Sequence, residues 1–223
     1  VVRRYFEFSQ VLGKPKIQSF AFVMRGRIRN GADGEWMPFV ARQYNHLTQP
    51  ARIYYIKGKG PMSGLDSYIN GTGRMRIKLF NLITIADSHG PEMDQSGLVT
   101  FLNDLLFCPT AYFSVPVEWE QIDERSAGLS LSHDEHRVSA VVTFDAEGRP
   151  VNWRSDDRYA DVDGEPLADR WSTPMSEFAE VNGLRVPVRG EGIHNYNGTE
   201  FVYAEVESIT NLQWDTAALP QTE

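Results

Sequence analysis

The segment from residue 71 to residue 112 constrains the fold most, because it is the one place where a strand-like pattern passes into a credible helix before strand-like patterns resume. Basic and apolar residues alternate from Arg74 to Leu79, and this period of two is typical of a half-buried strand. A helical pattern follows it. A chain organised in this way must combine one inserted helix with a sheet.

The helix is predicted over residues 94–107. Asp94 or Ser96 can cap its first turn, and Pro109 prevents it from continuing. Its apolar residues occupy most of its circumference: Leu98, Val99, Phe101, Leu102, Leu105, Leu106 and Phe107. A helix of this kind has to be covered on nearly all sides, and the rest of the sequence looks like sheet available to cover it.

The remainder of the chain has the patterns of roughly ten short strands in antiparallel order. The pairs Asn182-Gly183 and Asn197-Gly198 lie between alternating segments and are strong hairpin signals. No repeat or long linker marks a domain boundary. The sequence therefore predicts one α+β, mainly β domain over residues 1–223: a strongly curved antiparallel sheet, or incomplete barrel, with the helix across its concave face. Residues 1–15 are a lead-in segment, and residues 215–223 are expected to fray.

Charge and composition narrow the classes of partner. The formal net charge of −8 argues against nonspecific binding to nucleic acid or to an anionic bilayer surface. A single cysteine, Cys108, excludes an intrachain disulfide and a multi-cysteine metal site. No apolar run reaches the ~18 residues that a membrane-spanning helix needs. Because the sequence starts at Val1, a signal peptide or a membrane anchor can precede it.

Motifs that carry chemistry are weak. Nucleophile elbows and glycine-rich phosphate loops are absent, and His133-Asp-Glu-His136 is best interpreted as a solvated turn. The segment from Asp87 to Asp94 groups three carboxylates and an imidazole, but an acidic first helical turn explains it equally well. We therefore expect no catalytic residue, no metal and no cofactor.

Seven segments resemble a bacterial family of unknown function, in matching order and over nearly the whole chain. They are MRGRIR (24–29), WMPFVARQY (36–44), DSYINGTGRMRIKLFNL (66–82), GPEMD (90–94), LVTFLNDLLFCPTAY (98–112), VEWEQID (117–123) and DDRYAD (156–161). Members of that family look like relatives of the lipoprotein carriers LolA and LolB. The resemblance implies an unclosed barrel with helices in its concave side, and some members have membrane segments ahead of this domain.

The leading hypothesis is non-enzymatic binding of an apolar or amphiphilic ligand, such as a lipid or an acyl chain, between the sheet and the helix. The 12 Phe, 9 Tyr and 5 Trp residues can either close the concave face on a solid core or line a cavity there. The residues expected to line such a site are Phe20, Phe22, Met24, Phe39, Tyr55, Met75, Leu102, Leu106 and Trp119, with Arg42, Arg76 or Arg158 at a headgroup.

Two alternatives stay open. The first is a structural or interaction domain with a solid core, and the second is a hydrolase or metal-assisted lyase that uses Asp87, His89, Glu92 and Asp157. The resemblance favours the cell envelope over the cytoplasm, as a carrier or sensor with an envelope protein as a possible partner.

Overall fold

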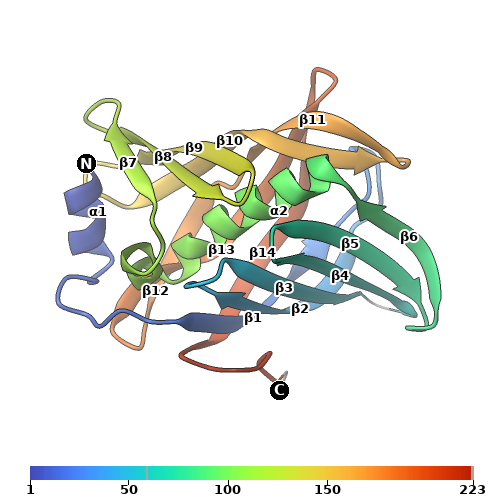
Figure 1. Cartoon of the computed structure of the whole chain (residues 1–223), viewed down its shortest axis with the longest axis horizontal. Coiled ribbons are helices and arrows are strands. Elements are labelled where there is room, and N and C mark those ends of the chain that lie inside the picture. Colours follow the sequence, from blue (N-terminus) through green and yellow to red (C-terminus); the bar gives the residue numbers. More distant parts are fainter. Residues whose placement is uncertain (59, 222–223) are drawn as a thin grey trace.

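The computed structural model describes residues 1–58 and 60–221, and their strands form one fourteen-stranded sheet that curls into a half-barrel (Figure 1). All strand pairs are antiparallel. The strand order is β6-β5-β4-β3-β2-β1-β14-β13-β11-β10-β9-β8-β7, and β12 pairs with β13 beside this path. The predicted fold class, a curved antiparallel sheet with a helix in its concave face, is confirmed.

The strands fall into two arms joined by the pairing of β1 with β14. The first arm comprises β1 (Ser19–Ile28), β2 (Met37–His46), β3 (Ala51–Gly58), β4 (Met62–Ile69), β5 (Thr72–Leu79) and β6 (Ile83–His89). The second comprises β7 (Glu118–Gln121), β8 (Ser126–His133), β9 (His136–Phe144), β10 (Pro150–Val162), β11 (Glu165–Ser172), β12 (Met175–Val181), β13 (Leu184–Tyr196) and β14 (Thr199–Trp214). The described residues thus form fourteen strands rather than roughly ten.

The long helix α2 (Pro91–Asp104) lies between the two arms. It contacts β4, β5 and β6 on one side and β9 and β10 on the other. It starts at Pro91 rather than at residue 94, and its end continues as a 3-10 turn, η1 (Leu105–Phe107). The predicted caps were wrong, because Gly90 is the N-cap and no side chain in the described part of the chain caps the helix. Proline suits this first position since it has no N–H to leave unpaired.

Both candidate caps form tertiary contacts instead. Asp94 Oδ1 accepts a hydrogen bond from the Gly73 N–H of β5 at 2.7 Å. The Tyr159 N–H of β10 donates to Ser96 Oγ at 2.8 Å. These two residues therefore fasten α2 to both arms of the half-barrel.

The end of the half-barrel beside α1 (Val2–Phe8) is closed by aromatic packing. Tyr5 is 1% exposed, and its ring lies 5.4 Å from that of Phe144 and 6.1 Å from that of Tyr112. Tyr112 belongs to the 3-10 helix η2 (Pro109–Phe113) that follows η1. The predicted lead-in segment is thus partly helical and part of the core.

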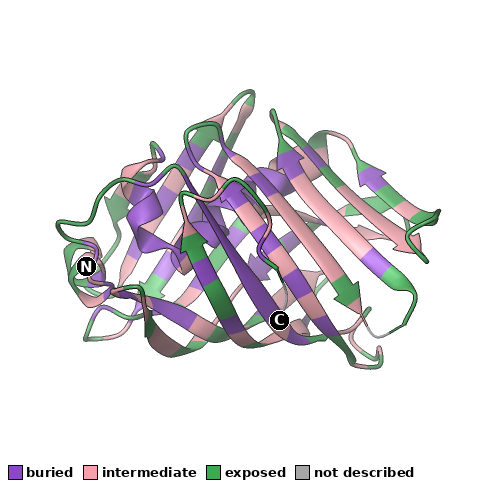
Figure 2. Cartoon of the chain, turned by 90° about the horizontal axis from the view of Figure 1, so that it is seen from below, coloured by how far each residue is buried: buried purple, intermediate pink, exposed green. Residues whose placement is uncertain are grey.

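Burial alternates clearly along β2, β8, β9 and β11 (Figure 2), as strands with one face on a core require. Both Asn-Gly pairs form hairpin turns, as predicted. Asn182-Gly183 joins β12 to β13, and Asn197-Gly198 joins β13 to β14. In the tail, which was expected to fray, the Asp215 N–H donates to the Ser19 carbonyl at 2.8 Å. Residues 222–223 lie outside the described part of the chain.

Candidate functional site

The apolar residues predicted from β1 and the helix lie between sheet and helix, in a region that is packed solid. Phe20, Phe22 and Leu102 are 0% exposed and Leu106 is 2% exposed. They belong to one continuous hydrophobic cluster that also contains Met24 and Phe39. Trp119 packs against the edge of this cluster, 5.2 Å from the ring of Tyr112 near α1. The deep part of the interior is therefore filled by side chains.

Three other predicted residues lie on the outer face of the sheet. The Arg42 guanidinium lies 5.3 Å above the ring of Tyr55, and Tyr55 and Arg76 line a surface notch of about 200 Å³ together with Ser63, Leu65, Lys78 and others. Met75 is on the inner face, since it pairs across the sheet with Asp66, which binds a buried arginine described next. The structure therefore separates the predicted ligand residues into two groups.

Inside the half-barrel, Arg52 of β3 forms a buried ion-pair network that the sequence did not point to. Its Nη1 donates to Asp66 at 2.6 Å, and its Nε donates to Asp104 of α2 at 3.0 Å. Asn45 donates to the same Asp104 carboxylate at 3.0 Å. Burial opposes the charge of Arg52, but the two carboxylates outweigh it and raise its pKa. Arg52 is therefore a fixed cation that ties α2 to the first arm.

A second buried polar cluster lies on the other arm, centred on Asp169 of β11, whose side chain is 0% exposed. Its Oδ2 accepts hydrogen bonds from His194 Nδ1 at 2.6 Å and from Arg158 Nη1 at 3.3 Å. Its Oδ1 accepts one from the Asn195 N–H at 2.8 Å. The two strands β11 and β13 bring these groups together, because Ser172 pairs with Ile193.

Aromatic rings complete this second cluster. The Arg158 guanidinium lies 4.6 Å above the ring of Trp171, and the His194 ring stacks on Tyr203 with a centroid separation of 3.9 Å. Trp171 Nε1 donates to the Tyr203 hydroxyl at 3.2 Å. This arrangement holds both the cation and the imidazole in fixed orientations.

The charges in the cluster follow from these contacts. Burial lowers the pKa of His194, although the hydrogen bond to Asp169 opposes the shift. Burial alone would raise the pKa of Asp169, but the hydrogen bond from His194 and the charge of Arg158 hold it below its usual value. A neutral imidazole therefore donates to a carboxylate near neutral pH. Arg158 Nε is buried and has no hydrogen-bond partner among the described residues, so one directed donor of the cation is unused.

The two clusters face each other across the interior. Burial raises the pKa of Tyr54 of β3, and Tyr203 of β14 and Asp66 add to the shift. Tyr54 also points its hydroxyl at Met24 Sδ, 3.9 Å away. Apolar side chains of the same inner face are only partly buried here, among them Ile56, Met75 and Ile77.

The residues of the enzyme alternative lie on three elements: Asp87 and His89 on β6, Glu92 on α2 and Asp157 on β10. Asp87 forms an ion pair with Arg74 at 2.5 Å, and His89 is exposed and lies on the same edge strand. Asp157 is on β10, where it accepts hydrogen bonds from the N–H and the hydroxyl of Ser139. In residues 1–58 and 60–221, no group of three or more His, Cys, Asp or Glu side chains could hold a metal ion.

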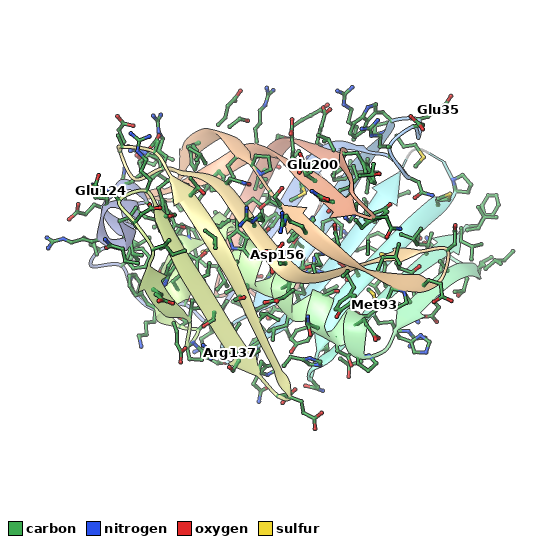
Figure 3. The ribbon with its side chains drawn as sticks, turned by 90° about the horizontal axis from the view of Figure 1, so that it is seen from above. Glu35, Met93, Glu124, Arg137, Asp156 and Glu200 are labelled. Carbon is green, nitrogen blue, oxygen red and sulfur yellow. The ribbon has the colours of Figure 1, made fainter. Side chains whose placement is uncertain are left out.

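A surface depression of about 490 Å³ lies outside the half-barrel on β7 to β10. Figure 3 looks onto this face, with Arg137 and Asp156 labelled among its lining residues and α2 behind the strands. Arg137 forms an exposed ion pair with Glu118 at 2.8 Å. This open groove is separate from both buried clusters.

Four residues of the second cluster were not selected from the sequence: Asp169, Trp171, His194 and Tyr203. A weak signal was available, since Asp169 and Trp171 alternate with Arg170 along a strand. Arg158, by contrast, was predicted at a headgroup, and the structure places it in the interior.

The comparison with protein families agrees with the resemblance to a family of unknown function noted in the sequence. A family model described as "Family of unknown function (DUF6544)" matches residues 1–206. A search of curated proteins finds no match. Among solved structures, a DUF1329 family protein from Desulfovibrio piger matches with 10% identity over 97% of this chain and 92% of its own, with a TM-score of 0.47. No helix in the described residues is long and apolar enough to cross a membrane.

Proposed function

We propose that this chain, which belongs to the DUF6544 family of unknown function, is a non-enzymatic binding protein for an amphiphilic molecule such as a lipid or a fatty acid. The polar end of the ligand would bind at Arg158, and its apolar part would lie along the partly buried inner face of β3 and β5. A curved half-barrel is compatible with holding a ligand in this way.

One observation carries the proposal: a buried arginine with an unused donor. Arg158 Nε has no hydrogen-bond partner among the described residues, while the Asp169 carboxylate beside it accepts hydrogen bonds from His194, Arg158 and the Asn195 N–H. A buried donor without a partner costs about 1–3 kcal/mol. A ligand that supplies a carboxylate or phosphate oxygen would recover this energy and form a charge-assisted hydrogen bond.

The apolar part of the ligand would contact side chains on the inner face of β3 and β5. Ile56, Met75 and Ile77 are partly exposed although they lie on the inner face of the sheet. An acyl chain that covered them would stabilise the complex by ~0.8 kcal/mol per buried methylene. The site therefore lies beside the filled region around Leu102 and Leu106, not within it.

The first test is native against denaturing mass spectrometry of freshly purified protein, with an organic extract analysed in parallel. Ligand-free protein is then titrated with palmitate by calorimetry. We expect Arg158→Gln to weaken palmitate binding about tenfold or more, since a charge-assisted hydrogen bond is lost. Arg137→Gln is the matched control, because Arg137 lies in an exposed ion pair on the outer face.

Arg158→Gln also removes a partner of Asp169, so its thermal melting is measured beside Arg158→Lys, which keeps the charge. A folded Arg158→Gln protein that binds palmitate as the wild type does would contradict the headgroup site. A wild-type protein that carries no extra mass and binds no palmitate would contradict the binding function. It would favour an interaction domain with a solid core and an envelope protein as partner.

A further inference from the structure

Large apolar side chains are exposed mainly at one end of the first arm. Ten large hydrophobic residues are exposed among the described residues, and six of them lie at the end where β2 starts, β4 starts and β5 turns into β6: Met37, Met62, Phe80, Leu82, Ile83 and Ile85. The most exposed are Leu82 at 82% and Phe80 at 67%. Exposed apolar clusters of this kind mark contact sites for partners or membranes.

The β5–β6 hairpin that carries four of these residues projects from the end of the molecule remote from α1 (Figure 1). Its tip is held in one conformation. The Phe80 N–H donates to the Pro61 carbonyl at 2.7 Å, and Ser63 Oγ donates to Asn81 Oδ1 at 2.5 Å. Phe80 and Asn81 both have positive φ, 53° and 57°, which turns the chain so that the apolar side chains on either side of Asn81 point outward.

The charge around this hairpin is opposite to that of the whole chain. Residues 57–86 contain five basic residues, Lys57, Lys59, Arg74, Arg76 and Lys78, and one acidic residue, Asp66. Asp66 points inward and pairs with Arg52. With the rest of β6 included, residues 57–89 also contain Asp87, which pairs with Arg74, and their net charge is +3 in a chain of net charge −8. The β5–β6 hairpin therefore has the opposite charge to the whole chain, while Asp33 and Glu35 precede Met37 in the neighbouring β1–β2 connection.

Two of these basic residues are placed to receive an anion beside the apolar tip. Arg76 and Lys78 line the notch of about 200 Å³ on the outer face, whose rim is formed by Asn81 of the tip. Lys78 has no ion-pair partner among the described residues. Arg76 is near Asp87, but that carboxylate is already held by Arg74 at 2.5 Å.

We infer that the β5–β6 hairpin docks the protein on the surface of a membrane that contains anionic lipids. Phe80, Leu82 and Ile83 enter the boundary between headgroups and acyl chains, and Arg76 and Lys78 bind lipid phosphate groups. Apolar side chains flanked by Lys and Arg are the combination that holds a peripheral protein at this boundary. The inference is independent of the proposed interior ligand.

The test is flotation with vesicles of phosphatidylcholine that contain phosphatidylglycerol, compared with vesicles of phosphatidylcholine alone. We expect the wild type to float with the anionic vesicles, and Leu82→Asp to reduce the vesicle-bound fraction by ~10-fold because it places a charge in the acyl boundary. Lys78→Gln should weaken binding less and make it less sensitive to salt. Ile122→Asp, which changes an exposed isoleucine (55%) away from this end, should bind as the wild type does.

Leu82 is so exposed that its substitution should leave the melting temperature unchanged, and this is measured for each variant. Equal flotation of Leu82→Asp and wild type would overturn the inference, and so would the absence of wild-type flotation. Sedimentation velocity is run in parallel. A wild-type dimer that Leu82→Asp dissociates, without vesicle binding, would assign the hairpin to a second copy of the chain and also overturn membrane docking.

Discussion

At the scale of single residues, His194 makes the stability of the protein depend on pH. Its pKa in the folded state is lowered, chiefly by burial, from the value of about 6.5 in an unfolded chain. Below about pH 6.5 the unfolded state therefore binds more protons, and the folded state loses stability as the pH falls. The pKa of Asp169 is lowered as well, so its contribution has the same sign but is lost only below about pH 4.

We therefore expect the melting temperature of the wild type to fall between about pH 7.5 and pH 5.5, and the fall to be smaller in His194→Asn. The variant should be less stable than the wild type at neutral pH by about 1–3 kcal/mol, since it disturbs the bond to Asp169. His89→Asn is the control, because His89 is exposed. Equal pH slopes in wild type and His194→Asn would show that His194 is not the titrating group.

The same cluster shows why the candidate site was only partly predictable. Arg158 was predicted at a headgroup, but its partners Asp169 and His194 were not selected from the sequence. Those two residues are 25 positions apart, and only the pairing of β11 with β13 joins them. A single sequence reports periodicity within a strand, but not which strands become neighbours. The placement of Tyr55 and Arg76 on the outer face of the sheet depends on strand register in the same way.

At the scale of elements, α2 needs a glycine in the strand beneath it. A Cβ on Gly73 of β5 would collide with the backbone carbonyl of Met93 in the first turns of α2. We expect Gly73→Ala to destabilise the protein by about 1–3 kcal/mol, because the backbone must shift to admit it. Urea unfolding measures the difference.

Gly128→Ala in β8 is the matched control, since its Cβ would meet nothing closer than 3.8 Å. We expect its effect on the free energy of unfolding to be smaller than that of Gly73→Ala. Similar losses in both variants would mean that the effect is a general cost of replacing glycine in this sheet. The close approach of β5 and α2 would then not explain the loss of stability in Gly73→Ala.

Some elements were predictable and others were not, for physical reasons. The helix was predicted because its apolar residues extend around its circumference, and the hairpins at Asn182-Gly183 and Asn197-Gly198 because Asn and Gly tolerate positive φ. The edge strand β6 was missed, since its first three residues are all exposed and show no alternation of burial. The helix caps were missed because Asp94 and Ser96 bind other elements, which local sequence does not reveal.

At the scale of the whole molecule, α2 converts an open curved sheet into a closed unit. It touches β4 to β6 and also β9 and β10, and its buried face joins a hydrophobic cluster that extends from Tyr5 to Leu212. The fold class was predictable because an apolar helix demands cover on all sides. Whether the space beneath it is filled was not, since this depends on the curvature of the sheet and the side-chain rotamers.

The continuous core predicts that the chain unfolds in one cooperative step. Trp119 of β7 and the pair Trp153 and Trp171, whose rings are 5.6 Å apart, all lie on the second arm, whereas far-ultraviolet circular dichroism reports on the strands of both arms. Tryptophan fluorescence and far-ultraviolet circular dichroism should therefore give coincident urea transitions.

Leu102→Ala should lower the free energy of unfolding by about 2–5 kcal/mol, through the cavity it leaves, and shift both signals together. Leu82→Ala, at an exposed position, should change it by less than about 0.5 kcal/mol. Two separate transitions, or a Leu102→Ala shift seen by one signal only, would mean that the two arms fold independently and that α2 belongs to one of them.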